Sequence, residues 1–159
     1  MATIKEGTTG NDSISNDKAD VIVYGYEGND TIDNKASNVT ISGGDGKDYI
    51  YNKPKYNSNP PWLNVSIDGG KDNDYIESRA RNTTIIGGDG HDTISNIGNE
   101  VSISGGFGNE TINSTGQDVT IYGGEGTDTI YSNGNNSYLD GGEGSDKIYS
   151  ENGSKNSSA

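Results

Sequence analysis

Apolar residues along the chain form two short alternating patterns that return at a fixed interval. A single Ile stands two positions after an acidic residue, and a Val-x-Ile pair or a close variant follows seven and nine positions later. The Ile set comprises Ile14, Ile32, Ile50, Ile76, Ile94, Ile112, Ile130 and Ile148. The paired set comprises Val21/Val23, Val39/Ile41, Val65/Ile67, Thr83/Ile85, Val101/Ile103, Val119/Ile121 and Ser137/Leu139. Alternation places such residues on one face of a strand, so each unit is predicted to hold two short strands.

A glycine-rich acidic turn joins the two strands in every unit. Clear copies read SGGDGKDYI (42–50), IGGDGHDTI (86–94), YGGEGTDTI (122–130) and DGGEGSDKI (140–148). The first glycine falls at positions 7, 25, 43, 69, 87, 105, 123 and 141, so the step is 18 residues except for one step of 26. One unit cannot bury its own apolar face, whereas stacked units can. The repeat therefore predicts an all-β solenoid of parallel strands with about eight 18-residue coils, in a single domain spanning 1–159. Its coils are expected over 7–152, with an inserted loop at 53–64.

Composition indicates that apolar burial alone does not hold these coils together. Of 159 residues only 27% are hydrophobic, and the formal net charge is −13, which approaches the composition of disordered chains. The acidic balance argues against nucleic acid as a partner, because nucleic acid binding needs Lys and Arg. The absence of Cys excludes disulfides and thiolate metal sites, and no apolar run is long enough to span a bilayer. A partner that is itself a cation fits this chain best.

The acidic residues of the glycine-rich turns recur in line, one per coil. They are Asp12, Asp30, Asp48, Asp74, Asp92, Glu110, Asp128 and Asp146. Stacked carboxylates about 5 Å apart would repel by roughly 1 kcal/mol per pair in water and ~3 kcal/mol at an effective dielectric near 20. Such a column is tolerable if cations lie between the coils. Carboxylate and carbonyl oxygens suit Ca²⁺ better than Mg²⁺, and glycines with positive φ let the turn aim its carbonyls inward.

The opposite edge of the predicted solenoid turns without an acid column. Its matching positions hold Asn16, Asn34, Asn52, Ser78, Asn96, Ser114, Ser132 and Ser150. Since an amide and hydroxyl ladder is enough to turn the chain there, the acids on the first edge call for a separate explanation. We therefore expect a single row of ions along one edge, in at most seven gaps between eight turns.

The turn sequence G-G-x-G-x-D resembles the nonapeptide of the RTX (repeats-in-toxin, hemolysin-type) calcium-binding family, and the resemblance runs from residue 7 to about 150. It implies a right-handed parallel β-roll that binds Ca²⁺ between adjacent turns, through Asp carboxylates and backbone carbonyls. The candidate metal residues are Asp12, Asp30, Gly43, Asp45, Asp48, Gly69, Asp74, Gly87, Asp89, Asp92, Gly105, Glu110, Gly123, Glu125, Asp128, Gly141, Glu143 and Asp146. Glu27 holds the same third position as Asp45, without a clean motif around it. The chain departs from the motif at Thr8, Tyr26, Asp72 and Glu110, so the sites there are less secure.

The resemblance implies a calcium-binding module that folds on binding Ca²⁺ and stabilises a larger secreted or cell-surface bacterial protein. We expect no enzyme activity, because His91 is the only histidine and no nucleophile–base pair is evident. The alternative is a polysaccharide-binding module, with Trp62 in the inserted loop as a candidate ligand contact. The only basic cluster, Lys71, Arg79 and Arg81, is small for an acidic glycan, which favours the structural function.

Overall fold

The computed structural model describes residues 3–53, 64–151 and 155–157. These residues form strands and turns and no helix, so the described part contains no helix that could cross a membrane. Trp62 and most of the predicted loop 53–64 lie outside the described residues.

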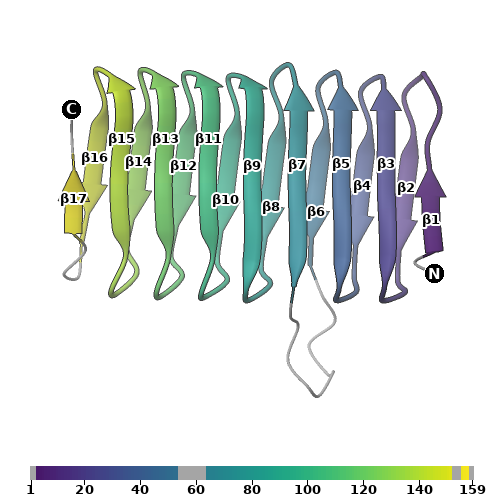
Figure 1. The fold of residues 1–159 in the computed structure, drawn as a ribbon, viewed down its shortest axis with the longest axis horizontal. Coiled ribbons are helices and arrows are strands. Elements are labelled where there is room, and N and C mark those ends of the chain that lie inside the picture. Colours follow the sequence, from purple (N-terminus) through teal and green to yellow (C-terminus); the bar gives the residue numbers. More distant parts are fainter. Residues whose placement is uncertain (1–2, 54–63, 152–154, 158–159) are drawn as a thin grey trace.

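The strands alternate along the chain between two parallel sheets (Figure 1). The nine-stranded sheet contains β1 (Thr3–Glu6), β3 (Val21–Glu27), β5 (Val39–Asp45), β7 (Val65–Lys71), β9 (Thr83–Gly90), β11 (Ser102–Gly108), β13 (Thr120–Gly126), β15 (Tyr138–Gly144) and β17 (Lys155–Ser157). The eight-stranded sheet contains β2 (Ser13–Asn16), β4 (Thr31–Asn34), β6 (Tyr49–Asn52), β8 (Tyr75–Ser78), β10 (Thr93–Asn96), β12 (Thr111–Ser114), β14 (Thr129–Ser132) and β16 (Lys147–Ser150).

Each strand pairs with the equivalent strand of the next coil. Ile94 lies opposite Ile112, and Ile103 lies opposite Ile121, so the register equals the 18-residue repeat. Across the insertion Val39 pairs with Val65, which keeps the same faces aligned over the longer step. The predicted all-β solenoid of parallel strands, with about eight coils, is confirmed.

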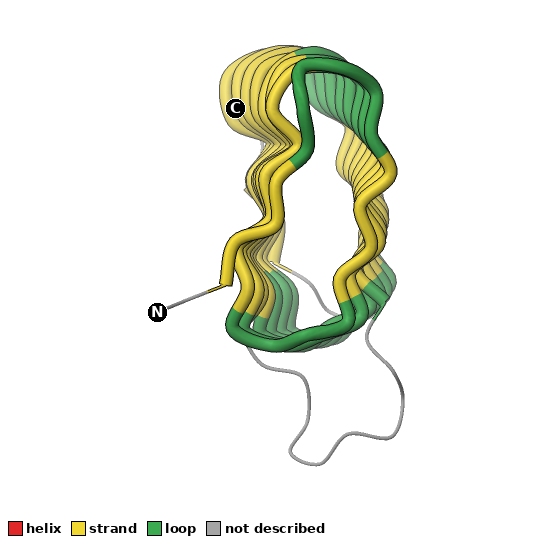
Figure 2. The backbone as a smooth tube through the Cα atoms, turned by 90° about the vertical axis from the view of Figure 1, so that its right-hand side faces the viewer, coloured by secondary structure: helices red, strands yellow, loops and turns green. Residues whose placement is uncertain are grey.

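The core consists of the two predicted apolar columns. The two sheets that carry them face each other in the end-on view of Figure 2. The Ile residues of the second sheet from Ile32 to Ile130 have 0% exposure, and Ile14 and Ile148 at the two ends are partly buried. Each such side chain contributes about 1.5–3 kcal/mol through burial. Tyrosines also pack on the outer face, since the ring centroids of Tyr131 and Tyr149 lie 4.7 Å apart in a stacked arrangement.

Two end strands extend the solenoid beyond the predicted coils. β1 pairs with β3 and β17 pairs with β15. In β1 the apolar residue stands out of phase with the repeat, because Ile4 pairs with the outward-facing Ile22 and is 54% exposed. This explains why the periodicity of the core did not reveal β1.

Candidate metal centre

The glycine-rich turns stack along one edge, at the top of Figure 1, and we call this edge the glycine-rich rim. It comprises the turns 7–12, 25–30, 43–48, 69–74, 87–92, 105–110, 123–128 and 141–146. The second and third glycines of the regular turns have positive φ, as at Gly88 (117°) and Gly90 (150°). A Cβ atom on Gly88 would lie 2.0 Å from the Gly70 carbonyl oxygen of the preceding turn. At such positions glycine lets the turns stack at the spacing of the sheet without a steric clash.

The sixth residues of these turns form the buried acid column: Asp12, Asp30, Asp48, Asp74, Asp92, Glu110, Asp128 and Asp146. The six members from Asp30 to Asp128 have at most 3% exposure. In most turns one carboxylate oxygen accepts the backbone N–H of the acid in the preceding turn. The Asp48 amide, for example, donates to Asp74 Oδ1 at 2.8 Å, and the Asp74 amide donates to Asp92 Oδ1 at 2.8 Å. The column is thus fixed to the backbone of the rim.

From Asp30 to Asp146, every carboxyl group of the column has at least one oxygen without a hydrogen-bond partner. The atoms concerned are Asp30 Oδ2, Asp48 Oδ2, Asp74 Oδ2, Asp92 Oδ2, Glu110 Oε1 and Oε2, Asp128 Oδ2 and Asp146 Oδ2. Removing a carboxylate oxygen from water without a partner is strongly unfavourable. A row of such oxygens needs either protons or cations.

Backbone carbonyls converge on the same places. A Cβ atom on Gly43 would lie 2.2 Å from Asp48 Oδ2 and 2.4 Å from the Gly69 carbonyl oxygen of the next turn. Gly87 shows the same arrangement, with Asp92 Oδ2 at 2.4 Å and the Gly105 carbonyl oxygen at 2.3 Å from a Cβ position. Because the first glycine has no side chain, hard oxygen donors from two turns can therefore approach each other closely. This donor chemistry fits Ca²⁺.

Burial raises the pKa of the acids in the column. It raises the pKa of Asp48 to about 6 and that of Asp74 to about 8, although each accepts a backbone N–H that opposes the shift. The pKa values of Asp30, Asp92 and Asp128 are raised for the same reason. Without a cation, burial therefore disfavours the ionised form of each of these groups, and Asp74, with a pKa of about 8, stays largely protonated at neutral pH.

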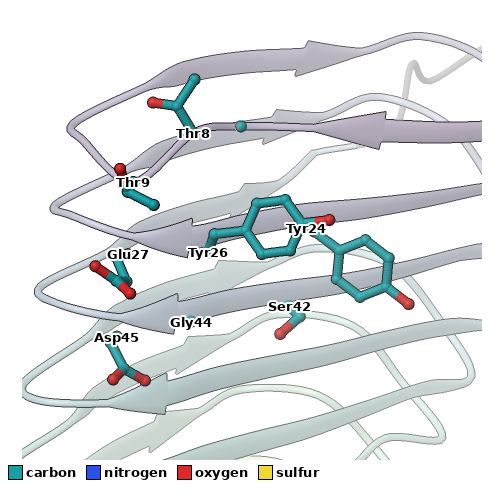
Figure 3. A pocket seen from close by; sticks show the side chains of 9 residues that line it. Thr8, Thr9, Tyr24, Tyr26, Glu27, Ser42, Gly44 and Asp45 are labelled. Carbon is teal, nitrogen blue, oxygen red and sulfur yellow. The ribbon is translucent and has the colours of Figure 1, made fainter.

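The first two turns, which lack the second glycine, differ from the others in their contacts. Asp12 Oδ2 is already engaged, because the Thr8 amide and Thr8 Oγ1 donate to it at 2.6 and 2.8 Å. Tyr26 stands in the second turn with a φ of 79°, a strained value for a bulky residue. Its ring lies 5.7 Å from that of Tyr24, beside a groove that Thr8 helps to line (Figure 3). The Asp12 carboxylate thus has less to offer a cation than the acids of the later turns.

The other two departures leave the rim in place. Asp72 replaces the third glycine and adopts a φ of 73°, the left-handed conformation expected for it. Glu110 stays in the column with 1% exposure. Burial, followed by the neighbouring Asp128 carboxyl group, raises the pKa of Glu110 to about 8.

The structure separates the predicted acids into two groups. Unlike the column, the third-position side chains are exposed on the outside of the rim: Glu27, Asp45, Asp89, Glu125 and Glu143. Asp45 forms an ion pair with Lys71 at 2.8 Å. Within the described residues no three His, Cys, Asp or Glu side chains gather as a metal cluster. A cation at the rim would therefore be held by carboxylates from the column together with backbone carbonyls.

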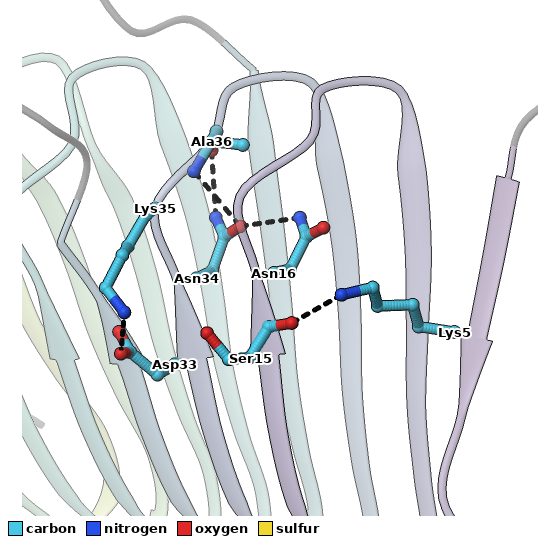
Figure 4. A network of polar contacts seen from close by, with 7 residues as sticks. All are labelled: Lys5, Ser15, Asn16, Asp33, Asn34, Lys35 and Ala36. Atoms are coloured by element: carbon cyan, nitrogen blue, oxygen red, sulfur yellow. Dashed lines mark hydrogen bonds and ion pairs between the residues drawn. The ribbon is translucent and has the colours of Figure 1, made fainter.

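Asparagine side chains on the opposite edge bond one another and the backbone (Figure 4), although Ser132 Oγ on the same edge lies buried without a partner. Asn16 Nδ2 donates to Asn34 Oδ1 at 2.9 Å. Asn34 Nδ2 in turn donates to Asn52 Oδ1 of the next coil, also at 2.9 Å. Asn34 Nδ2 also donates to the Ala36 carbonyl oxygen at 2.9 Å. The predicted amide and hydroxyl ladder is present there and leaves no row of carboxylates.

A second ladder on the rim was not anticipated. Side chains at the fifth turn position accept the backbone N–H of the next turn, as when the Asn29 amide donates to Asn11 Oδ1 at 2.8 Å. His91 takes part, because its Nδ1 accepts the Asn109 amide at 2.8 Å. The repeated Asn at positions 11, 29, 73 and 109 is the sequence signal that could have revealed this ladder.

The basic cluster considered for an acidic glycan is dispersed into ion pairs. Lys71 contacts Asp45, and Arg79 contacts Glu77 at 3.0 Å. Arg81 pairs with Glu100. These residues therefore present little net positive charge to an anionic ligand.

Comparison with known proteins agrees with this geometry. The family model described as the RTX calcium-binding nonapeptide repeat (4 copies) matches residues 6–38, 24–52, 79–95, 104–139 and 133–154. No curated protein and no solved structure matches the chain. The family matches cover more than half of the sequence, and they include most turns of the buried acid column. The chain therefore belongs to the RTX calcium-binding repeat family and is a calcium-binding β-roll module.

Proposed function

We propose that this chain is a structural module that folds when Ca²⁺ binds in a single row along the glycine-rich rim. The observation that carries the proposal is the row of buried carboxylate oxygens without partners, from Asp30 to Asp146. Divalent cations between the turns would neutralise these oxygens and join each coil to the next. The opposite edge offers no such oxygens in its Asn ladder, which supports one row rather than two.

The regular turns are the strongest candidates for the ions. Asp48, Asp92 and Asp128 would each supply one Oδ2, and the first-glycine carbonyl of the following turn would supply another oxygen. When bound, the ions would supply positive charge that neutralises the buried carboxylates. They would thereby hold together coils that the low apolar content of this chain cannot hold alone. Asp12 is the least suited, since Thr8 already occupies its Oδ2. No catalytic step is part of this function.

Calcium dependence suits a protein that acts outside the cell. With a net charge of −13 and 27% hydrophobic residues, the metal-free chain is expected to be expanded. Extracellular modules bind Ca²⁺ with dissociation constants of about 0.1–1 mM. Such a chain would stay unfolded where calcium is scarce and would fold after export, as part of a larger secreted or surface protein.

Circular dichroism combined with calorimetric calcium titration tests this function. We expect the strand signal to appear on adding calcium and to disappear with excess chelator. Asp48→Asn should reduce the number of bound ions, whereas Asp45→Asn, at an exposed position in the same turn, should leave it unchanged. A strand signal that persists in chelator, together with no measurable calcium binding, would refute the proposal.

A polysaccharide-binding function is the second candidate, and one groove favours it. The groove has a volume of about 640 Å³ and lies beside the paired rings of Tyr24 and Tyr26 (Figure 3). Hydroxyl groups of Thr8 and Ser42 and the carboxylate of Asp45 complete its lining. Aromatic faces bordered by polar groups suit sugar rings, and the acids favour a neutral glycan.

Glycan-array binding distinguishes this second function. Loss of a glycan signal in Tyr24→Ala, with calcium-induced folding intact, would support it. Tyr149→Ala is the matched control, because it removes an exposed tyrosine from the other sheet. If the native protein and both variants bind no glycan, the second candidate is rejected.

A further inference from the structure

Glu110 places its carboxyl group differently from every aspartate in the buried acid column. A Cβ atom on Gly123 would lie 2.3 Å from Asp128 Oδ2, but one on Gly105 would lie 3.1 Å from Glu110 Oε2. The other oxygen, Glu110 Oε1, lies 2.8 Å from a Cβ position on Gly108, the third glycine of the same turn. The longer side chain thus spans the turn from its first glycine to its third.

The hydrogen-bond ladder along the column is interrupted at the same residue. Asp128 Oδ1 accepts the Glu110 amide at 2.8 Å, as the ladder requires. Neither oxygen of Glu110 accepts the Asp92 amide of the preceding turn, because both lie buried without a donor. The aspartates that take part in the ladder each keep only one oxygen free.

The two pairs of neighbouring turns that share Glu110 therefore bring together more free anionic oxygen than any other pair. Of these two pairs, the turns 105–110 and 123–128 are favoured, because the Asp128 carboxyl group acts on Glu110 more strongly than that of Asp92 does. Glu110 contributes two oxygens and Asp128 contributes Oδ2, making three in all, whereas Asp74 and Asp92 contribute one each. Glu110 is only 1% exposed and Asp128 is fully buried, so water does not compensate these charges. Calcium accepts both oxygens of one carboxylate, and its affinity rises with the number of charged ligands.

We propose that these two turns form the tightest calcium site of the chain, with Glu110 donating both carboxylate oxygens to the ion. The inference rests on the proposed calcium-dependent folding and adds an order of filling to it. The site at Glu110 fills first as calcium rises and empties last as calcium is removed. Glu in place of Asp at position 110 would thus raise the calcium affinity of this one site above that of the others.

Calcium titration calorimetry on the full chain tests the inference with two opposite substitutions. The native protein should show one site that binds about tenfold more tightly than the rest. Glu110→Asp restores the regular turn and should lower the calcium affinity of this site to that of the others, without lowering the number of bound ions. Asp92→Glu introduces the same extension one turn earlier and should create a second tight site.

Terbium luminescence gives a second readout that does not depend on affinity. Terbium(III) bound at the tight site of the native protein should retain about one fewer coordinated water than in Glu110→Asp, because the two-oxygen carboxylate displaces it. If the native protein and Glu110→Asp give superimposable titrations and equal water counts, the inference is overturned while calcium binding stands. If the native protein binds no calcium, the proposed function itself fails.

Discussion

At the scale of single residues, the rim depends on a close match between a glycine and an acid. The first glycine of each regular turn faces the carboxylate of its own turn and the carbonyl of the next. At Gly87 a Cβ atom would lie 2.4 Å from Asp92 Oδ2 and 2.3 Å from the Gly105 carbonyl oxygen. A methyl group does not fit there because these oxygens already occupy the space, so the missing side chain is what lets the two oxygen donors approach each other. Glycine and acid therefore form one functional unit.

Gly87→Ala should consequently affect folding and calcium binding together. The added methyl group displaces the Asp92 carboxylate and the next turn, so we expect a loss of about 1–3 kcal/mol in the free energy of unfolding with calcium present. Calcium titration should show at least one ion fewer. Urea unfolding and calorimetry measure both effects.

Gly10→Ala is the matched control for this substitution. A Cβ atom on Gly10 would approach nothing closer than Thr8 Oγ1, at 3.9 Å. We expect native stability and native calcium binding in this variant. Equal behaviour of Gly87→Ala and Gly10→Ala would show that the space beside the first glycine has no role in binding.

At the scale of strands and turns, the features that could be predicted from the sequence are those that recur once in every 18-residue coil. The Ile and Val columns, the acid column and the Asn ladder all follow the 18-residue step, so their stacking follows from parallel pairing alone. The end strand β1 escaped prediction because Ile4 stands out of phase with the core. Which carboxylate oxygen is free was also beyond the sequence, since this depends on the amide of the preceding turn. The exposure of Asp45 and Asp89 was missed for a similar reason, because spacing does not show on which side of a turn a side chain lies.

The Asn ladder should stabilise the edge opposite the rim independently of calcium. Asn34→Ala removes the donor to Asn52 Oδ1 and the donor to the Ala36 carbonyl oxygen, both buried. Each buried polar group left without a partner costs about 1–3 kcal/mol, so we expect a loss of at least ~2 kcal/mol in the free energy of unfolding. The number of bound calcium ions should not change.

The control for the ladder is Asn113→Ala, which removes an exposed amide from β12. It should change the free energy of unfolding by less than about 0.5 kcal/mol. If Asn34→Ala lowers the number of bound ions while stability at saturating calcium is preserved, the two edges are not independent and this account of the ladder is wrong.

At the scale of the whole molecule, buried acids link folding to both protons and calcium. Burial raises the pKa of Asp48 to about 6 and the pKa values of Asp74 and Glu110 to about 8, above the value of about 4 in an unfolded chain. Between about pH 4 and about pH 8, the metal-free fold therefore binds more protons than the unfolded chain. Its free energy of unfolding is highest below about pH 4 and falls as pH rises through 6 to 8. Protonation of the exposed acids acts in the same direction, since it reduces the self-repulsion of a chain with net charge −13.

Calcium should reverse the pH dependence of the free energy of unfolding, because a cation binds the ionised carboxylates and protons compete with it. We expect the metal-free protein to show more strand signal and a higher melting temperature at about pH 5.5 than at about pH 8. At moderate calcium the order should invert, with greater stability at the higher pH. Circular dichroism melts of protein freed of metal by chelation and dialysis, with and without added calcium, measure both slopes. A metal-free protein that is more stable at the higher pH would show that the acid column is not the element that makes folding depend on cations.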